Sequence, residues 1–487
     1  MNNTVREIEP IELWNNFADL NAIPRASKKE ERVIEFIINF GKSLGLETFK
    51  DEVGNVIIKK PATAGMENRK VVALQSHLDM VHQKNGDTEF DFNTQGIEMY
   101  VDGDWVKAKG TTLGADNGIG VASIMTILAS KTILHPPIEA LFTIDEETGM
   151  TGALGLKGGL LNAEIMLNLD TEDDNELTIG CAGGIDVTAS GTYDLVDVNT
   201  IDIAKKITLK GLTGGHSGMD IFKGRANANK LMNRILWLAS NQFNIQINSI
   251  DGGSLRNAIP RESKAIIVIN NDNIINLETF INEQQAILKS EYYITDPNLI
   301  LTIEDAILPQ KVFSNAFQSV CLKSIYSCVN GIYRMSSSIE GLVQTSNNLA
   351  RVLINEGNYS IQCLTRSSVD SEKMDLANSL QACFELMGAT ISFGGSYPGW
   401  APNKESSIVK LMSDLYLDRY NENALVSACH AGLECGILGT FYPHIEMISF
   451  GPNIKGAHSP DEKCQISSVQ KYWGFLLETL VRIPVAN

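Results

Sequence analysis

The sequence has no long hydrophobic run. No apolar stretch approaches the roughly 20 residues that a membrane-spanning helix needs. The first residues, MNNTVREIEPIELWNNF, do not combine a basic start with an apolar core, as a secretory signal peptide would. We therefore expect neither a membrane anchor nor secretion.

Paired cysteines are also missing. Eight cysteines are scattered from Cys181 to Cys464, and none forms a C-x-x-C pair. In a chain of 487 residues this is not the pattern of a disulfide framework. It predicts reduced thiols and a cytoplasmic protein. No cysteine has the neighbours of a catalytic nucleophile.

The sequence has fewer basic residues than acidic ones. The chain has 40 Lys and Arg against 58 Asp and Glu, a net charge of −18. So acidic a protein is unsuited to nucleic acid or an anionic membrane as a partner, and it favours cation binding. At 487 residues it is also too long for one ordinary core, so we expect at least two domains.

The first quarter of the chain alternates helix and strand. The stretch Ser27–Leu46 has helical spacing and begins with Ser27 and Glu30 in a capping-box pattern. Strands are predicted at NVIIKK, KVVALQSH, IEALFTIDEE and EIMLNLDT, and a buried helix at NGIGVASIMTILAS. This alternation predicts an α/β fold with a mixed, mostly parallel sheet flanked by helices.

A second domain is predicted to begin near residue 200. Strands such as AKKITLK and ESKAIIVIN alternate with the helix GRANANKLMNRILWLASN, which is typical of an α+β domain. A similar pattern of strands and helices recurs over about 300–390, starting at NLILTIEDA, so the insert is a candidate for duplication. We expect the first domain over 1–202 and 394–487, with the inserted domain over 203–393.

Five polar clusters lie at predicted strand ends or turns. They are His77 with Asp79, Asp116, Glu146 with Glu147, Asp170, and His458. Taken singly, each has an ordinary explanation, such as a chance polar edge or a solvated turn. Taken together they have the composition of a two-metal hydrolase, in which imidazoles and carboxylates bind two ions and one carboxylate stays free to accept a proton.

The order H-x-D, D, E-E, D, H resembles that of the co-catalytic zinc exopeptidases. This family includes aminoacylase, carboxypeptidases acting on glutamate conjugates, and carnosinase-like dipeptidases. Within it, the phrases GTTLGADNGIG, TIDEETGMTGA, GGHSG, HAGLECG and GAHSPDE are most similar to the branch of aminoacyl-histidine dipeptidases. The resemblance covers the whole chain, and it implies a catalytic domain with an inserted lid domain.

The resemblance also implies the metal ligands. His77 and Asp170 would bind one ion, Glu147 and His458 the other, and Asp116 would bridge them. The family's bridging aspartate precedes a cis peptide, here Asp116–Asn117. The ions would be two divalent cations per chain, Zn²⁺ by first choice, with Mn²⁺ or Co²⁺ as alternatives.

Three further residues acquire catalytic roles by the same resemblance. Asp79 would orient the imidazole of His77 from behind the metal. Glu146 would act as general base on a metal-bridged hydroxide, and His216 would stabilise the oxyanion from the lid domain, which must close over the substrate. Substrate contacts are expected from Arg366, which would bind the free α-carboxylate, and from Asn257, Gly432 and Glu434.

These assignments predict metal-dependent hydrolysis of dipeptides, with Xaa-His dipeptides as the expected substrates. An N-acyl-amino-acid amidohydrolase or a tripeptidase of the same fold is the alternative. A non-catalytic metal-binding or peptide-binding protein of this fold would not need Glu146. The expected partner is a small peptide; relatives are often homodimers, which leaves monomer and homodimer both open.

Overall fold

The computed structural model describes residues 4–486, and the chain divides into two compact units. The first unit contains residues 1–180, 402–428 and 433–487, and the second contains residues 181–401 and 429–432. The expected divisions after residues 202 and 393 differ from these boundaries. The reason is that β9 (Gly183–Thr192) and β21 (Thr390–Tyr397) pair within the sheet of the second unit.

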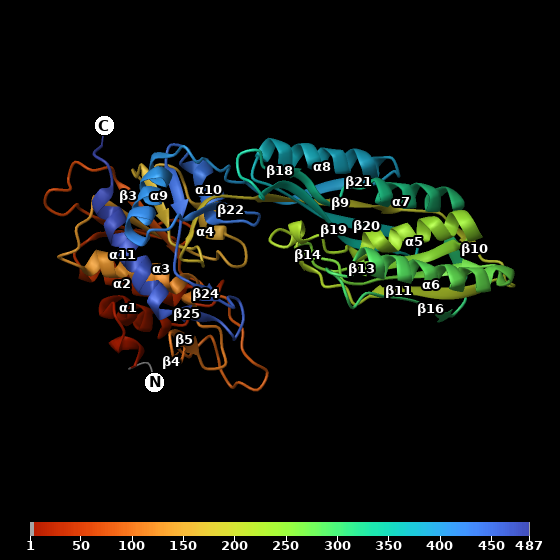
Figure 1. Ribbon diagram of the computed structural model, residues 1–487, viewed down its shortest axis with the longest axis horizontal. Helices are drawn as coiled ribbons and strands as arrows, with labels where there is room; N and C mark the ends of the chain where they lie inside the picture. Colours follow the sequence, from red (N-terminus) through yellow and green to blue (C-terminus); the bar gives the residue numbers. More distant parts are fainter. Residues whose placement is uncertain (1–3, 487) are drawn as a thin grey trace. The chain divides into compact units, whose positions relative to one another are not determined.

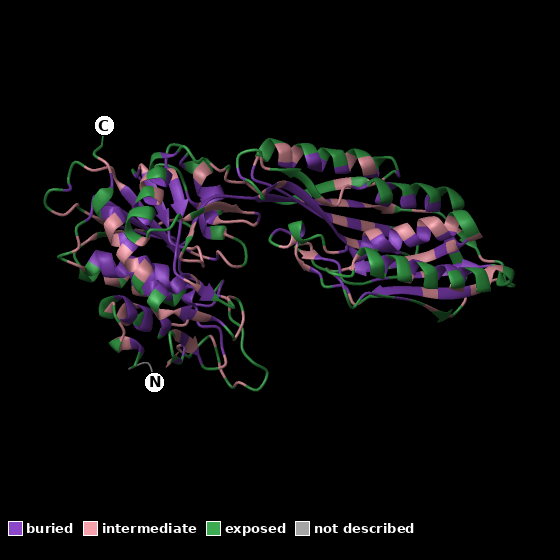
Figure 2. Ribbon diagram, in the orientation of Figure 1, coloured by how far each residue is buried: buried purple, intermediate pink, exposed green. Residues whose placement is uncertain are grey.

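The first unit is built on an eight-stranded sheet in the order β1-β2-β6-β3-β7-β23-β8-β22. Neighbouring strands among β6, β3, β7 and β23 run parallel, whereas β1, β2 and β6 pair antiparallel. The bounds are β1 (Glu47–Lys50), β2 (Val56–Lys60), β3 (Val72–His77), β6 (Ile138–Thr143), β7 (Ile165–Asn168), β8 (Glu176–Cys181), β22 (Leu425–Cys429) and β23 (Glu446–Ser449). Figure 2 draws these central strands as buried.

The first unit also contains helices, which alternate with the strands along the chain, as the predicted α/β fold requires (Figure 1). They are α1 (Ile11–Asn21), α2 (Glu31–Ser43), α3 (Ala115–Ala129), α4 (Thr151–Gly155), α9 (Ser407–Tyr420), α10 (Glu434–Phe441) and α11 (Ile466–Arg482). A small sheet joins β24 (Ile454–Lys455), β25 (Lys463–Gln465), β5 (Trp105–Ala108) and β4 (Met99–Asp102). Among residues 4–486, no helix has the length and hydropathy that a membrane crossing requires.

The capping box predicted at Ser27 is wrong. Helix α2 begins at Glu31, and no side chain caps its start. The hydroxyl of Ser27 instead donates to Asp79 Oδ2 at 2.8 Å. The local pattern was correct for a helix start, but a carboxylate distant in sequence binds the hydroxyl.

The second unit contains a nine-stranded sheet, in which eight strands form two βαββαβ halves and the ninth, β18 (Gly331–Met335), pairs with a strand of the second half. One half uses β11 (Ile203–Lys210), α5 (Ala228–Phe243), β13 (Gln246–Gly253), β15 (Ser263–Ile269), α6 (Ile274–Glu291) and β16 (Ile300–Ala306). The other uses β9, α7 (Asn315–Ser327), β19 (Val343–Asn355), β20 (Asn358–Ser367), α8 (Asp370–Glu385) and β21. The four helices lie against the sheet and share one hydrophobic core with it (Figure 1).

The two halves meet where β13 pairs antiparallel with β19. The order β16-β11-β15-β13 on one side corresponds to β21-β9-β20-β19 on the other. The predicted duplication is therefore confirmed, with one correction. The stretch NLILTIEDA forms β16, the last strand of the first half, because β9 takes the first position of the second half.

Candidate active site

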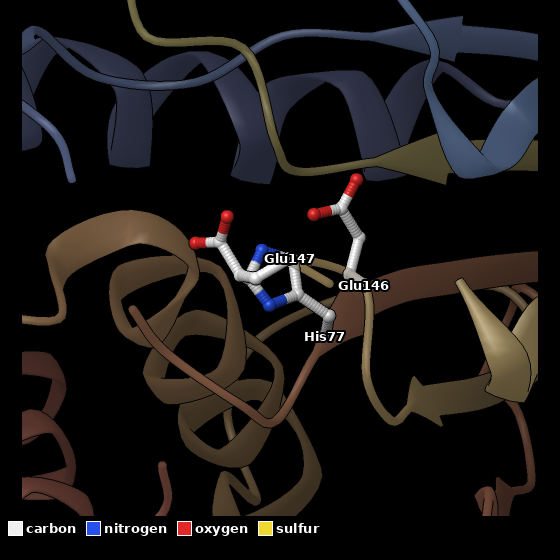
Figure 3. Close-up of side chains that lie close together, drawn as sticks. All are labelled: His77, Glu146 and Glu147. Carbon is white, nitrogen blue, oxygen red and sulfur yellow. The ribbon is translucent and has the colours of Figure 1, made fainter. Parts of the chain in front are cut away.

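Three adjacent parallel strands of the first unit end in the predicted polar residues. His77 is the last residue of β3, Glu146 and Glu147 follow β6, and Asp170 follows β7. The carboxyl ends of parallel strands share one edge of a sheet, which is where open α/β sheets bind ligands. Figure 3 shows the side chains of His77, Glu146 and Glu147 close together at this edge.

Two more polar residues reach this edge from elsewhere. Asp116 lies at the start of α3, and its peptide bond to Asn117 is cis, as predicted. His458 lies in the turn between β24 and β25. The two oxygens of Asp116 face different imidazoles: Oδ1 is 3.1 Å from His77 Nε2, and Oδ2 is 3.3 Å from His458 Nε2.

These side chains form two groups that share Asp116. In one group, His77 Nε2 also lies 3.5 Å from Asp170 Oδ1, and in the other, His458 Nε2 lies 3.0 Å from Glu147 Oε2. The ligand atoms within each group lie within 4.8 Å of one another. A third group of the same kind contains His77, Glu146 and Glu147. A shared carboxylate with an imidazole on each side is an arrangement suited to two cations.

The residues of these groups fit divalent cations. Glu147 Oε1 is buried and has no hydrogen-bond donor among residues 4–486, and an unpartnered buried carboxylate oxygen is costly unless a cation or donor satisfies it. Imidazole and carboxylate ligands suit zinc, and carboxylates also suit manganese.

The field at this edge of the sheet is strongly negative. Hydrogen bonds to Asp116 and Glu147 raise the pKa of His458 to about 11. Burial opposes the protonation of His77, but the charge of Asp170 and hydrogen bonds to three aspartates outweigh it and raise its pKa well above 6.5. A site that retains protons so firmly attracts cations.

Asp79 connects two of these elements. It is completely buried, and its Oδ1 lies 3.3 Å from His77 Nδ1. It also accepts hydrogen bonds from the backbone N–H groups of Glu146 at 3.0 Å and Glu147 at 3.3 Å. One carboxylate therefore fixes both the imidazole after β3 and the glutamate turn after β6.

Glu146 has the environment of a proton acceptor of unusual basicity. Burial is the main cause that raises its pKa well above the ordinary value, and neighbouring carboxylates such as Asp170 and Glu147 add to it. No hydrogen bond to its carboxylate is found among the described residues. Glu146 thus differs from Asp79, which is held from several sides.

A separate polar cluster lies in the second unit. The guanidinium of Arg366, at the end of β20, donates to the Tyr397 hydroxyl at 2.7 Å and lies 3.4 Å from both Ser217 Oγ and His216 Nε2. Arg366 is only 4% exposed, and no carboxylate within residues 4–486 forms an ion pair with it. A buried guanidinium without an acid is available to bind an anion.

The imidazole of His216 is neutral in this cluster. Burial and the charge of Arg366 lower its pKa to about 4. Its Nδ1 accepts hydrogen bonds from the N–H groups of Gly218 at 3.2 Å and Met219 at 3.1 Å. A neutral imidazole that accepts at Nδ1 carries its proton on Nε2, so these two bonds favour the tautomer that donates from Nε2, whereas the Arg366 Nη2 donor, 3.4 Å from Nε2, favours the other tautomer.

The remaining predicted substrate contacts are divided between the two units. The carbonyl of Asn257 accepts from the N–H of Ser217 at 2.7 Å, and its side chain is exposed. Gly432 belongs to the second unit, whereas Glu434 begins α10 of the first. Glu434 is fully buried, and its Oε2 accepts from Gln75 at 2.7 Å and Thr143 at 2.6 Å. The structure thus joins Arg366 to His216 in one cluster of the second unit, and Glu434 lies in the first unit.

Two residues at the site were missed at the sequence level. Glu462 accepts hydrogen bonds from consecutive backbone N–H groups that lead to Asp116, and Arg25 donates to the backbone after His77 and before Asp116. Glu462 is part of the phrase GAHSPDE, which was the only available signal. Nothing in the sequence around Arg25 distinguishes it from a surface arginine.

Known proteins match this chain over nearly its whole length. Cytosol non-specific dipeptidase of Escherichia coli (strain K12) is 43% identical over 478 residues, which cover 98% of this chain and 99% of the relative. The crystal structure of aminoacylhistidine dipeptidase from Vibrio alginolyticus superposes with a TM-score of 0.93 at 43% identity and covers 99% of both chains. A tripeptidase from Staphylococcus aureus shares the fold, with a TM-score of 0.56 at 17% identity over 97% of this chain and 98% of its own.

The profile of one peptidase family matches residues 73–482, which contain all the predicted metal ligands. This match agrees with the relatives above and with the α/β fold expected of a metal-dependent exopeptidase. The chain belongs to Peptidase family M20/M25/M40.

Proposed function

We propose that this protein is a metal-dependent dipeptidase that hydrolyses small dipeptides, Xaa-His dipeptides among them. The observation that carries the proposal is the pair of side-chain groups that share Asp116 at the carboxyl edge of the sheet. The names of the two relatives at 43% identity support dipeptides as substrates.

The two groups would hold two divalent cations, His77 and Asp170 on one side and Glu147 and His458 on the other, with Asp116 between them. Two such cations would polarise the scissile carbonyl and lower the pKa of a water molecule toward neutrality. Zn²⁺ is our first choice because two of the five ligands are imidazoles.

Glu146 is the proposed general base. Its carboxylate is not needed to complete either group, and it lies beside His77 and Glu147 (Figure 3). A carboxylate with a raised pKa accepts a proton from water more readily than an ordinary one. The same proton would then be available for the leaving amine.

His216 is the proposed donor to the oxyanion that forms when the carbonyl is attacked. Its low pKa and the two backbone N–H groups at its Nδ1 support this role, because a neutral imidazole with its proton on Nε2 donates without gaining a charge. His216 belongs to the second unit, so this role requires both units to act on one substrate.

Arg366 is the proposed anchor for the free α-carboxylate of the dipeptide. A guanidinium matches a carboxylate in two parallel hydrogen bonds, and Arg366 has no competing acid among the described residues. We further propose that Asn257, Gly432 and Glu434 contact the substrate, with Glu434 directed to its α-amine.

The relative from E. coli is named as a cytosolic enzyme, and we propose the cytosol for this chain as well. The acidic surface and the absence of a membrane-spanning helix among residues 4–486 agree with that location. We propose no protein partner beyond a second copy of the chain, which sedimentation of the full-length protein would test.

A single set of assays tests the proposed function. The full-length protein is analysed for bound metal and assayed on free dipeptides, tripeptides and N-acyl amino acids, before and after a chelator, and after Zn²⁺, Mn²⁺ or Co²⁺ is restored. We expect two metal ions per chain and dipeptide hydrolysis that disappears with the chelator and returns with metal. Hydrolysis that survives complete metal removal would overturn the proposal, and preference for acylated amino acids would indicate an amidohydrolase.

A further inference from the structure

Glu462 lies four residues after His458 and is only 3% exposed. Its carboxylate accepts hydrogen bonds from a run of consecutive backbone N–H groups: Leu113 at 2.8 Å, Gly114 at 3.0 Å, Ala115 at 2.7 Å and Asp116 at 3.3 Å. Consecutive N–H groups that point to one side form an anion-binding concavity. Here a carboxylate of the same chain fills it.

The carbonyl side of the same segment is held by Arg25, which is 1% exposed. Arg25 Nη2 donates to the carbonyl of Gly114 at 2.5 Å, and Nη1 donates to the carbonyls of Leu78 and Asp79, each at 3.1 Å. Gly114 has φ +70°, and a Cβ there would lie 2.5 Å from Arg25 Nη2. The backbone before Asp116 is therefore fixed by one buried charge on each side.

This arrangement joins two parts of the chain that are distant in sequence. His458 and Asp116 face each other at 3.3 Å, yet they lie on a turn of the small sheet and at the start of α3. Glu462 belongs to the turn of His458 and holds the backbone of Asp116 itself. Movement of either segment would change the distance between the two side chains.

We propose that Glu462 is a positioning residue that sets the spacing of Asp116 and His458 and so tunes the affinity for the cation between them. The inference rests on the proposed function, because it takes these two residues as metal ligands. It predicts unequal effects on the two groups. The group of His458, Glu147 and Asp116 depends on Glu462 for two of its members, whereas the group of His77, Asp170 and Asp116 depends on it for one.

The test measures metal affinity directly. Metal-free, full-length protein is titrated with Zn²⁺ in competition with a chromophoric chelator, for the wild type, Glu462→Gln and Glu462→Asp. The amide of Gln turns an N–H toward backbone N–H groups, and Asp is one methylene too short. We expect one of the two Zn²⁺ affinities to fall about 10–100-fold in both variants, the usual effect of changing a residue that supports a metal ligand. The other affinity should change less.

Glu139 offers a matched control. It is also a buried carboxylate of the first unit, and it accepts backbone N–H groups from Asn162 at 2.7 Å and Ala163 at 3.0 Å. It lies four residues before the end of β6, roughly 13 Å from the polar edge of the sheet. Glu139→Gln should lower the thermal midpoint of the metal-free protein as Glu462→Gln does, without any effect on Zn²⁺ affinity.

Two outcomes separate the possible failures. If both Glu462 variants lose stability but keep both Zn²⁺ affinities within about twofold of the wild type, Glu462 only supports the start of α3 and the inference is wrong. If the wild type itself binds no Zn²⁺, the proposed function fails before the inference is tested. A Co²⁺-loaded sample adds a spectroscopic check, since the absorption of Glu462→Gln should shift and that of Glu139→Gln should not.

Discussion

The histidines of the two polar clusters, one cluster in each unit, have opposite electrostatic surroundings. In the first unit, His458 lies among carboxylates that raise its pKa to about 11. In the second unit, burial and the charge of Arg366 lower the pKa of His216 to about 4 and that of His430 to about 3. The side chain is the same, and its neighbours decide which charge it tolerates.

Because of this difference, the two clusters are suited to ligands of opposite charge. A site that favours positive charge is suited to cations, and a site with a guanidinium and neutral imidazoles is suited to an anion such as a carboxylate or an oxyanion. Hydrolysis of a dipeptide needs both, which is the reason to propose that both clusters act on one substrate. The predictions below test each side of this comparison.

The largest effect is expected from Glu146→Gln in the first unit. The amide cannot accept a proton from water, so kcat should fall by about 10³–10⁴-fold. Both metal ions should remain bound, because Glu146 is not a proposed ligand. Glu147→Gln, its neighbour, should lose metal as well as activity. Near-normal turnover in Glu146→Gln with full metal content would show that the base lies elsewhere.

The second prediction concerns His216, the neutral imidazole proposed as a hydrogen-bond donor in the second unit. His216→Ala should lower kcat by about 10²–10³-fold, the usual cost of one lost oxyanion donor. Metal content, measured on the same samples, should not change. A fall in metal content would mean that His216 is a ligand, and the contrast between the two units would then be wrong.

The third prediction concerns the anion that Arg366 is proposed to bind. Loss of one partner of a buried charge pair costs at least about 2 kcal/mol, so Arg366→Ala should lower kcat/KM for a free dipeptide by roughly 30-fold or more. On the C-terminally amidated dipeptide, the wild type should already be poor and the variant little worse. Equal losses on both substrates would exclude Arg366 as the residue that recognises the carboxylate.

The smallest expected effect is the contribution of His430 to the pH dependence of the free energy of unfolding. The folded pKa of His430 is about 3, below the 6.5 of an unfolded histidine, because of burial and then the charges of Arg366 and His216. Its contribution to stability is therefore complete above pH 6.5 and is lost as the pH falls from 6.5 toward 3. At pH 5 the unfolded state gains about 2 kcal/mol from protonation of this residue.

His430→Gln removes that titration and retains a polar group near Ser346, whose hydroxyl lies 2.7 Å from His430 Nε2. Urea unfolding at pH 7 and pH 5 should therefore reveal a smaller acid-induced loss in the variant than in the wild type. Identical losses would mean that His430 is protonated in the folded state and that its environment is not as described.

The sequence predicted which polar side chains meet at one edge of the sheet, because its signals are local. A strand followed at once by a polar pair, as in His77 and Asp79, is visible in the printed order of residues, and parallel strands bring such ends together. The expected domain boundaries differ from the division of the structure, since strand pairing between residues far apart in sequence determines where β9 and β21 belong.

The residues that hold Asp116 and the segment after His77 in place could not be predicted. Glu462 and Arg25 form hydrogen bonds with backbone N–H and carbonyl groups. Nearly every residue has these groups, so no pattern of side chains in the sequence predicts which of them Glu462 and Arg25 will contact. Ser27 illustrates the same limit: its spacing to Glu30 predicts a helix cap, yet its hydroxyl binds Asp79. Long-range contacts of this kind depend on the finished fold.

In the second unit, the chain segment of the first half lies between β9 and the rest of the second half. This arrangement sets the order in which the strands can pair during synthesis. Strand β9 leaves the ribosome first, but its partners β20 and β21 begin at Asn358 and Thr390. At about 5–20 residues per second, β9 waits roughly 10–35 s for the first of them. The half from β11 to β16 is contiguous in the chain and is complete in the meantime. It can therefore fold first and present the edge of β13 as the template on which β19, and then β20 and β9, assemble.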